Sequence, residues 1–488
     1  MVIESLKYKI LQQFGFAPTQ EQGQALDTFV SFLIDRDPQA VMILRGSAGT
    51  GKTSLSGAIV RTLLQIRQKV MLLAPTGRAA KVFSLGSGAP AYTIHRRIYR
   101  EKAFAGVDGQ FSLNDNLYTD TLFMVDEASM IANMGLGGTT FGSGCLLDDL
   151  VKFVYQGHND RLLLIGDKAQ LPPVGEEESP ALSASVMEGY GLKVYECDLN
   201  EVLRQSQSSG ILYNATLIRQ MITHDAVTGL PLIRFKGFAD IVMMPGAELV
   251  ESLGDSYHHV GMDETMVITR SNKRANIYNN GIRNMVLDRE EELSSGDMLM
   301  IVKNNYFWTE KEKKESGEGS AGAVPAFLAN GDRAKVLRVS NYIELYGFRF
   351  ATMLLQLPDY DDYEMQVTGM LDTLQSEAPA LTHEQQEELF RQVEEDYQHF
   401  VPLKADRMKS IRQDAYFNAL QIKYAYAVTC HKAQGGQWAH VYVDQGYMTD
   451  DMLTPDYIHW LYTAFTRATD KLFLVNWPKE QTCEPTDL

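Results

Sequence analysis

The residues best suited to chemistry in this sequence lie in a glycine-rich stretch, RGSAGTGKTS, near its start. The spacing of Gly46, Gly51, Lys52 and Thr53 matches the pattern G-x-x-x-x-G-K-[ST]. Glycines let such a loop curl so that backbone N–H groups face phosphate oxygens at a helix N-terminus. The lysine can then reach the β- and γ-phosphates, and the threonine hydroxyl can bind Mg²⁺. The residues expected to bind ATP here are Gly46, Ser47, Ala48, Gly49, Thr50, Gly51, Lys52, Thr53 and Ser54.

The segments on either side of this stretch predict the elements that would position it. Apolar residues 40–44 indicate a buried strand, and residues 53–64 indicate a helix. The alternative is a chance glycine turn before a helix. Because a strand and a helix are both expected in the right places, the nucleotide interpretation is favoured.

Two further expected strands end in polar residues that suit the same site. Residues 122–125 are followed by Asp126, a candidate Mg²⁺ ligand, and Glu127, a candidate base that orients the attacking water. Residues 161–165 lead into Gln170, which is placed to contact a γ-phosphate. Ligands of open α/β sheets bind beyond the carboxyl ends of the strands, so these side chains are expected to meet there. An isolated Asp-Glu pair would more often cap the next helix, but together with the phosphate loop this is the less favoured interpretation.

Composition indicates a folded protein of several domains. A length of 488 residues suggests about three domains, and 45% hydrophobic residues exclude a disordered chain. No segment approaches the roughly 18 apolar residues of a membrane span, and the start resembles no secretory signal. Four scattered cysteines indicate free thiols, so we expect a cytoplasmic protein without a membrane partner. The net charge of -17 argues against nucleic acid, but basic residues gather locally at 95–102.

Several further motifs occur in an order that resembles superfamily 1 helicases of the RecD-like, Dda-like and Pif-like branch. Motif Ia of that branch is similar to APTGRAA (74–80), and its TIHR element is similar to YTIHRRIY (92–99). Motif V resembles TCHKAQGGQ (429–437), and motif VI resembles WLYTAFTRATDKLFLV (460–475). Residues 18–22 look like the Q motif. The resemblance covers both ends of the chain and misses parts of its middle.

The resemblance implies that ATP lies between two motor lobes, with Gln22 on the adenine edge and Gly435 toward the cleft. Arginines must also reach the nucleotide from a second domain, because groups of one lobe cannot sense domain closure. Arg204 and Arg467 are the candidates, although Arg467 could instead be a surface arginine that ends an amphipathic helix. The expected catalytic residues are Lys52, Glu127, Gln170, Arg204 and Arg467, and the expected metal ligands are Thr53 and Asp126.

The resemblance also implies a nucleic-acid track that is held through its backbone. A histidine such as His95 is more often a satisfied structural group, but the arginines beside it favour a phosphate contact. Such contacts ignore the bases and the 2′-hydroxyl, so they imply little sequence specificity and do not separate DNA from RNA. Cys430 is interpreted as core packing, because neighbouring side chains diverge too far to share a metal with His431. The expected contacts are Thr76, Arg78, Thr93, His95, Asn304, Asn305, Thr429 and His431.

The expected fold is α/β, with two RecA-like doubly wound P-loop motor lobes. The resemblance adds a small β-hairpin insertion and an SH3-like β-barrel insertion that carries an extra helix. The expected domains are 1–205 for lobe 1A, with the hairpin at about 100–120, 206–330 and 418–488 for lobe 2A, and 331–417 for the barrel.

Two insertions carry predictions of their own. Residues 104–118 indicate a hairpin with Asp108 and Gly109 in its turn. In the family such a hairpin is a pin that separates strands, with Phe104 or Phe111 stacking on a terminal base pair. Packing of these rings onto the motor is an equally good interpretation.

The second insertion contains an acidic segment, 383–400, with Thr382 and Gln385 as a capping box that starts a helix. Its acidic face indicates exposure to solvent, with a protein partner as the less favoured alternative. The charged segment 310–322 is expected to be a loop. The predicted apolar face of the helix carries Leu389, Val393, Tyr397 and Phe400.

Together these features imply an ATP- and Mg²⁺-dependent DNA helicase that moves 5′ to 3′ on single strands and unwinds fork or tailed duplex. The polarity follows from the resemblance alone, and the sequence does not choose among pathways such as repair and recombination. One alternative is a translocase or remodeller that hydrolyses ATP without separating duplex. Another is a P-loop switch or scaffold that uses nucleotide as a signal, which the motifs of the second lobe disfavour.

Overall fold

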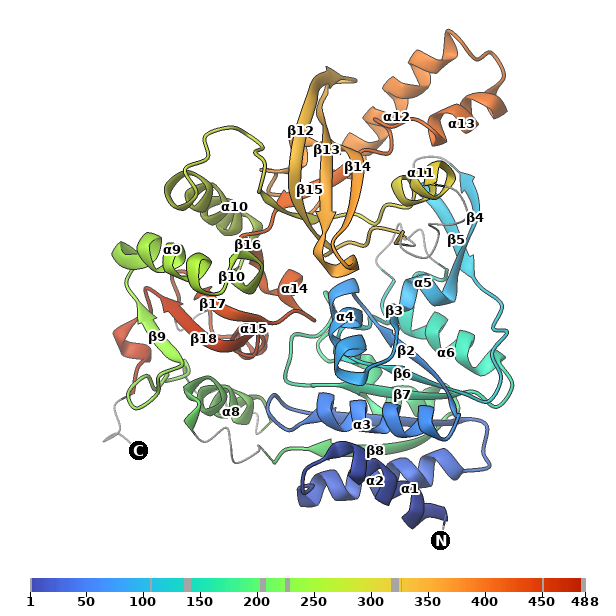
Figure 1. The fold of residues 1–488 in the computed structure, drawn as a ribbon, viewed down its shortest axis with the longest axis vertical. Helices are drawn as coiled ribbons and strands as arrows, with labels where there is room; N and C mark the ends of the chain where they lie inside the picture. The colour runs from blue at the N-terminus through green and yellow to red at the C-terminus, as the bar shows by residue number, and fades with distance from the viewer. Residues whose placement is uncertain are drawn as a thin grey trace. The chain divides into compact units, whose positions relative to one another are not determined.

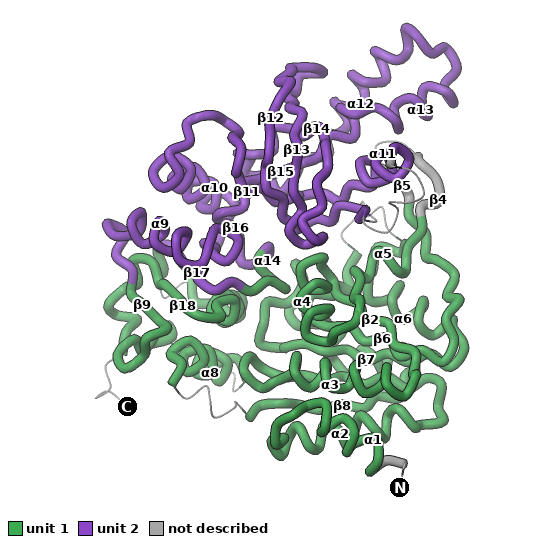
Figure 2. The backbone as a smooth tube through the Cα atoms, in the orientation of Figure 1, with its two compact units in different colours: residues 1–243, 433–437, 447–488 green, residues 244–432, 438–446 purple. Residues whose placement is uncertain are grey.

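The chain forms two compact units in a computed structural model (Figure 2). Unit 1 comprises residues 1–243, 433–437 and 447–488, and unit 2 comprises residues 244–432 and 438–446. The side chains of residues 2, 3 and 101–110 are not described. The structure describes residues 2–105, 108–135, 142–201, 208–223, 229–316, 324–325, 327–449 and 452–483.

Unit 1 is built on a six-stranded sheet in the order β3-β2-β6-β7-β1-β8. Neighbouring strands are all parallel, and β1, β6 and β7 are largely buried along their length, as expected for continuous apolar runs. The register brings the carboxyl ends of β1, β6 and β7 to one edge of the sheet. The strands are β1 (Ala40–Gly46), β2 (Lys69–Ala74), β3 (Ala91–Thr93), β6 (Thr121–Val125), β7 (Arg161–Gly166) and β8 (Lys193–Leu199).

Helices cover both faces of this sheet, which is the doubly wound arrangement (Figure 1). Alternate residues of β1 enter two hydrophobic clusters: Met42 and Leu44 join one, and Val41 and Ile43 join the other. The first cluster contains side chains of α1 (Val2–Phe14), α2 (Gln20–Ile34), α3 (Lys52–Gln65) and α4 (Gly77–Ser87). The second contains side chains of α5 (Ile94–Ile98), α6 (Leu146–Gln156) and α7 (Ala184–Gly189). Among the helices that the structure describes, none is long and apolar enough to cross a membrane.

Other parts of unit 1 complete its architecture. The hairpin β4 (Tyr99–Ala105) and β5 (Asp108–Leu113) is antiparallel, and Ala105 pairs with Asp108. Asp108 and Gly109 therefore lie in β5. The prediction that these two residues form the turn was wrong. The remaining elements are α8 (Gly210–Thr223), β9 (Ile241–Met244), α15 (Pro455–Phe465) and β18 (Ala468–Val475), of which β9 and β18 are adjacent.

Unit 2 contains a second parallel set of strands, with β10 (Thr265–Thr269) between β16 (Ala427–Thr429) and β17 (Trp438–Asp444). The helices α9 (Leu249–His259) and α10 (Asn272–Gly281) belong to this part, and a π-helical turn, η6 (Ile282–Val286), continues α10. The strand–helix succession resembles that of unit 1. Both units therefore belong to the α/β class that the sequence predicts.

A closed five-stranded barrel forms the other part of unit 2. Three of its strands fall within the expected range 331–417, whereas β11 and β15 lie outside that range. These two strands close the barrel, because β11 pairs with β12 and β15, and β15 also pairs with β14. Closure leaves no open sheet edge. The strands are β11 (Met298–Ile301), β12 (Arg333–Leu345), β13 (Phe348–Leu357), β14 (Tyr363–Met370) and β15 (Leu420–Tyr424).

Two helices, α12 (His383–Gln398) and α13 (Lys404–Arg412), pack beside the barrel. The capping box of Thr382 and Gln385 forms as predicted. Leu389 and Val393 are buried in a cluster with barrel residues, but Phe400 lies beyond the end of α12 and is 79% exposed. The expectation that Phe400 continues the buried face was therefore wrong.

A further helix, α11 (Phe307–Ser316), occupies the first part of the segment that we expected to be a loop. Charge alone does not prevent a helix, since Glu and Lys are good helix formers. The buried Trp308 also anchors this helix by donating from its indole N–H to the carbonyl of Asn418 at 2.9 Å. The remaining residues of the expected loop, 317–322, lie outside the described part of the chain.

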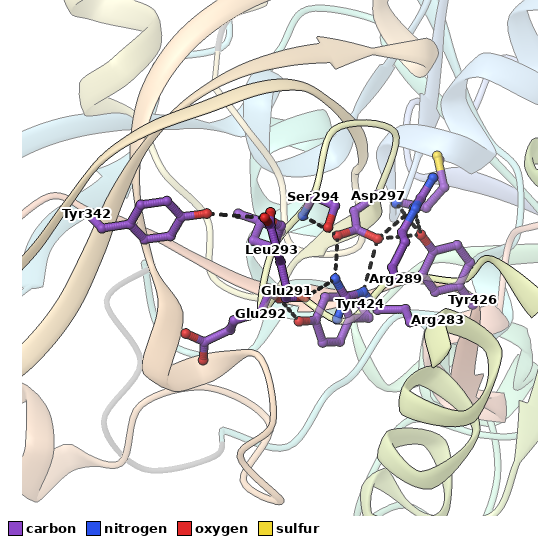
Figure 3. A network of polar contacts seen from close by, with 11 residues as sticks. Arg283, Arg289, Glu291, Glu292, Leu293, Ser294, Asp297, Tyr342, Tyr424 and Tyr426 are labelled. Carbon is purple, nitrogen blue, oxygen red and sulfur yellow. Dashed lines mark hydrogen bonds and ion pairs between the residues drawn. The ribbon is translucent and has the colours of Figure 1, made fainter. Parts of the chain in front are cut away.

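A buried polar network joins η6 to the base of the barrel (Figure 3). The Asp297 carboxylate is fully buried and accepts from Arg283 at 3.0 and 3.1 Å, from Arg289 at 2.7 Å and from the Tyr426 hydroxyl at 2.8 Å. It also accepts from the backbone N–H of Ser294 at 2.7 Å. A buried carboxylate with this many donors is satisfied, so the network fixes one arrangement of these segments.

The close contact of α3 and α4 predicts the effect of a glycine substitution. A Cβ at Gly57 would lie 2.5 Å from the carbonyl oxygen of Gly86. We expect Gly57→Ala to lower the free energy of unfolding by roughly 1–3 kcal/mol, because the helices must separate. Urea denaturation measures this change.

Gly23→Ala is the matched control, since Gly23 lies in α2 and a Cβ there would meet nothing within 4 Å. It should raise stability by about 0.5–1 kcal/mol. Equal stabilisation by both substitutions would contradict the close approach of α3 and α4.

Candidate active site

The phosphate loop connects β1 to α3 at the carboxyl edge of the sheet. Gly49 and Gly51 adopt φ values of +77° and +80°, in the left-handed region that favours glycine. A Cβ at Gly46 would lie 2.8 Å from Cγ of Lys52, so only glycine lets that lysine fold back over the loop. Gly51 precedes α3 without a side-chain cap, which leaves the first N–H groups of the helix for a ligand.

Lys52 and Gln22 contact the loop from different positions. The Lys52 ammonium donates to the carbonyls of Gly46 at 2.5 Å and Ser47 at 2.9 Å. Gln22 is buried within the capping box of α2 and donates from Nε2 to the carbonyl of Thr50 at 2.9 Å. Gln22 therefore supports the loop backbone, and its predicted adenine contact stays a prediction.

The two acids after β6 have strained and desolvated surroundings. Glu127 adopts a φ of +53°, which is uncommon for a residue with a side chain. Burial raises the pKa of Asp126 to about 7, the nearby Glu127 charge adds to this rise, and Lys52 opposes it. A carboxylate that is costly to ionise by itself gains from a cation. Asp126 and the Thr53 hydroxyl thus have the hard oxygen donors that suit Mg²⁺.

Gln170 lies in the loop after β7 and is buried. Its Oε1 atom has no hydrogen-bond partner among the described residues. An unsatisfied buried acceptor costs about 1–3 kcal/mol, so this oxygen would gain from a donor such as a water molecule. That property fits the predicted place of Gln170 beside the reacting phosphate.

Side chains from α15 and from segment 433–437 bind directly to these loops within unit 1. The Tyr462 hydroxyl accepts from the backbone N–H of Ala48 at 3.0 Å and donates to the Asp167 carboxylate at 2.6 Å. The N–H of Leu171 donates to the Thr463 hydroxyl at 2.8 Å, and the Leu171 carbonyl accepts from Nε2 of Gln434 at 2.7 Å. The phosphate loop and the loop after β7 are both tied to the C-terminal part of the chain.

Arg467 is 2% exposed, so the alternative of a surface arginine is wrong. Its guanidinium donates to the carbonyls of Thr463 and Gly436, both at 3.1 Å, and to the Thr466 hydroxyl at 3.2 Å. These bonds join the end of α15 to segment 433–437. The predicted contact of Arg467 with nucleotide stays a prediction, and Arg204 lies outside the described residues.

Gly435 and the predicted DNA contact Arg78 meet at the start of α4. Gly435 has a φ of +72°, and a Cβ there would lie 3.0 Å from Oγ1 of Thr76. Arg78 donates to the carbonyl of Gln437 at 2.5 Å. Thr76 caps α4 by accepting from the N–H of Ala79 at 3.2 Å. Segment 433–437 thus packs against the residues expected to hold the strand.

The TIHR element has a similar local role. Thr93 caps α5 by accepting from the N–H of Arg96 at 3.3 Å. Burial lowers the pKa of His95 to about 4, so this ring is neutral at pH 7 and would offer a phosphate a hydrogen bond without charge. The guanidinium of Arg97 stacks on the Tyr92 ring, 3.6 Å from its centroid.

The predicted contacts of unit 2 divide into structural and exposed groups. Asn305 donates to the carbonyl of Asn418 at 3.0 Å and accepts from the N–H of Trp308 at 3.3 Å, so its amide is used within the protein. Oδ1 of Asn304 accepts from the N–H of Asn330 at 2.6 Å. Thr429 ends β16, and His431 is exposed in the short helix α14 (Cys430–Ala433) that follows.

The two neighbours Cys430 and His431 have different surroundings. Cys430 is fully buried, as the interpretation as core packing predicts. No group of three or more His, Cys, Asp or Glu side chains that could hold a metal ion occurs in the described parts of the chain.

The candidate pin residues are only partly described. Phe111 packs against the hydrophobic cluster that contains α5 and α6. This contact matches the interpretation that the ring packs onto the motor. The Phe104 side chain lies outside the described residues.

Sequence reasoning missed several residues that the structure brings to the site. Tyr462 and Thr463 lie in the segment that resembles motif VI, two turns of helix or less from the predicted Arg467. Arg219 of α8 reaches the phosphate loop, where it donates to the Ser47 hydroxyl. No local motif marks Arg219, so its place could not be found from the sequence.

Comparison with known families agrees with this geometry. An AAA domain model matches residues 17–229, and a UvrD-like helicase C-terminal domain model matches residues 424–475. The two matches contain the phosphate loop and the C-terminal segments that bind to it. Each model covers less than half of the chain, so these matches show similarity in two regions, one to an AAA domain and one to a UvrD-like helicase C-terminal domain.

The individual relatives of this chain are distant. The ATP-dependent RecD2 DNA helicase of Deinococcus radiodurans is 30% identical over 157 residues, which are 32% of this chain and 18% of the relative. The ATP-dependent DNA helicase Dda of Enterobacteria phage T4 is 25% identical over 267 residues, which are 53% of this chain and 55% of the relative. The chain thus spans about half of one relative and less than a fifth of the other.

A solved structure of Bacteroides Pif1 helicase, in complex with ADP-AlF3 and single-stranded DNA, is also similar. It has a TM-score of 0.46 at 13% sequence identity, and the match covers 96% of this chain and 95% of that chain.

The bonds of Tyr462 predict the effect of removing its hydroxyl. Tyr462→Phe leaves the Ala48 N–H and one acceptor of Asp167 without their partner in a buried place. We expect the free energy of unfolding to fall by about 1–3 kcal/mol, measured by urea denaturation. Tyr447→Phe, at a residue that is 82% exposed, is the control and should change little. Equal stability of the two variants would count against the buried contact.

Proposed function

We propose that this chain is an ATP-driven motor that moves 5′ to 3′ along single-stranded DNA and separates fork or tailed duplex. One observation carries the proposal: Tyr462, Thr463 and Gln434 bind directly to the loops that surround the phosphate site. These three residues lie in the region matched by the UvrD-like helicase C-terminal model. Through such bonds, the loss of the γ-phosphate would shift the segments that resemble motifs V and VI.

The residues at the site have the chemistry that ATP hydrolysis requires. Lys52 would neutralise charge on the β- and γ-phosphates, and Glu127 would orient the attacking water. Gln170 would contact the water or the γ-phosphate through its amide. Thr53 and Asp126 would hold Mg²⁺, which supplies positive charge to the phosphates. Arg467 and Arg204 are proposed to stabilise the charge of the transition state.

The track is proposed to be held through its phosphates. Thr76, Arg78 and Gly435 lie together within unit 1, so a strand bound near α4 would be close to segment 433–437. Both named relatives are ATP-dependent DNA helicases, which favours DNA over RNA for this chain. The 5′-to-3′ direction is proposed on the resemblance to their branch.

A second candidate is a translocase that hydrolyses ATP without separating duplex. The packing of Phe111 onto the sheet core favours it, because a packed ring is less available to stack on a base pair. The strand-separation role of Phe104 and Phe111 therefore stays a prediction. A protein partner at the acidic face of α12 also stays a prediction.

Matched unwinding assays test the proposal. The measurement compares ATP turnover and strand separation on 5′-tailed and 3′-tailed duplex DNA. We expect DNA to stimulate turnover and only the 5′-tailed duplex to be unwound. Lys52→Ala should lower turnover by roughly 100-fold or more, because it removes a charge that acts on the transition state. Lys9→Ala, an exposed lysine of α1, is the control and should behave as wild type.

Each other outcome points to a different conclusion. Unwinding of the 3′-tailed duplex alone would overturn the direction. Stimulated turnover without any unwinding would favour the translocase. Turnover that DNA does not change would favour a nucleotide switch.

A further inference from the structure

A third arginine, besides the two that the sequence predicts, lies at the phosphate loop. Arg219 of α8 donates from Nη1 to the hydroxyl of Ser47, the second residue of the loop. Ser47 is 7% exposed, so this contact is largely shielded from water. Within the described parts of the chain, Arg219 forms no ion pair with a carboxylate. The contact that Arg219 makes with the loop is therefore to a neutral hydroxyl group.

The position of Lys52 indicates which end of a bound nucleotide would lie beside Ser47 and Arg219. The Lys52 ammonium lies 2.9 Å from the carbonyl oxygen of Ser47, on the residue whose hydroxyl Arg219 contacts. A phosphate-loop lysine reaches the β- and γ-phosphates, whereas the N–H groups at the start of α3 cradle the phosphates nearer the nucleoside. The Ser47 corner is thus the γ-phosphate end of the site.

Among the described residues, neither Lys52 nor Arg219 forms an ion pair with a carboxylate, although Lys52 is within electrostatic range of Asp126. Asp167 also lies near the loop, and its two oxygens accept from Tyr462 at 2.6 Å and from the N–H of Ala169 at 3.0 Å. Burial raises the pKa of Tyr462 well above its ordinary value, and Arg219 opposes this rise. The guanidinium of Arg219 is therefore within electrostatic range of the Tyr462 hydroxyl, which accepts a hydrogen bond from the Ala48 N–H.

We propose that Arg219 contacts the terminal phosphate of a bound nucleoside triphosphate and that the Ser47 hydroxyl is its partner when the phosphate is absent. A neutral hydroxyl satisfies one of the five guanidinium donors, whereas a phosphate offers several charged acceptors in a geometry that arginine matches. The inference rests on the proposed ATP site and adds to it a residue that distinguishes ATP from ADP.

The proposal gives α8 a role in sensing the nucleotide. α8 packs against α15, which carries Tyr462, so two packed helices each place one side chain on the phosphate loop. Movement of the Arg219 side chain from Ser47 to a γ-phosphate would change the contact between α8 and the phosphate loop, and thereby the position of the packed pair α8 and α15. If Arg219 only holds α8 against the loop, its removal should change the affinities for ATP and ADP by the same factor.

The test measures nucleotide affinity by fluorescence titration of the full chain with Mg²⁺ present, using ADP and a non-hydrolysable ATP analogue. Arg219→Gln should weaken the ATP analogue by roughly 10- to 100-fold and ADP by less than about 3-fold. Arg219→Lys, which keeps the charge but loses the planar fork, should fall between wild type and Arg219→Gln. Arg36→Gln removes an exposed arginine of the same unit and should change neither affinity.

Each remaining outcome overturns the inference. If Arg219→Gln weakens both nucleotides by the same factor, Arg219 is only a structural fastener. If it weakens neither nucleotide, Arg219 does not contact the phosphates. Failure of the wild type to bind either nucleotide would instead remove the proposed ATP site itself, so the two failures are distinguishable.

Discussion

The hydrogen bonds on the peptide groups of Leu171 set the position of the loop after β7, which carries Gln170. The N–H of Leu171 donates to Thr463 at 2.8 Å, and its carbonyl accepts from Gln434 at 2.7 Å. The side chain of the preceding residue, Gln170, is buried with an unpaired oxygen, so its place depends on how the backbone beside it is held. Each buried bond of this kind costs about 1–3 kcal/mol to leave unmade, which makes the arrangement a discrete state.

The same C-terminal residues explain why the chain divides as it does. Residues 433–437 and 447–488 belong to unit 1, although the preceding and intervening segments belong to unit 2. The stretch TCHKAQGGQ therefore straddles the division, with residues 429–432 in one unit and 433–437 in the other. This stretch begins at the end of β16 in one unit and ends in hydrogen bonds to residues of the other. Its Cys-His pair has no shared chemistry, since one side chain is buried and the other is exposed.

How much the sequence could predict depended on whether a feature is local. The phosphate loop, the acids after β6 and the capping box of α12 are each predicted from residues a few positions apart. The structure has the loop before α3, the two acids directly after β6 and the capping box at the start of α12. Tyr462 and Arg219 could not be assigned, because their partners in the loop lie 414 and 172 residues away along the chain. The barrel extends beyond its expected range because β11 and β15 are needed to close it, and closure is a property of the whole sheet. The helix α11 was missed because the charged, Gly- and Ser-rich composition of 310–322 indicated a loop, whereas its anchor, Trp308, lies before that segment.

We propose that segment 433–437 couples the nucleotide loops to a bound strand. The most direct measurement is the ratio of ATP turnover with and without single-stranded DNA in Gln434→Leu, which removes the bond to Leu171. We expect this ratio to fall by roughly 5-fold or more while the affinity for ATP changes little, because the substitution breaks a coupling and not a binding contact. A ratio equal to that of the wild type, or an equal loss of ATP binding and stimulation, would contradict the account.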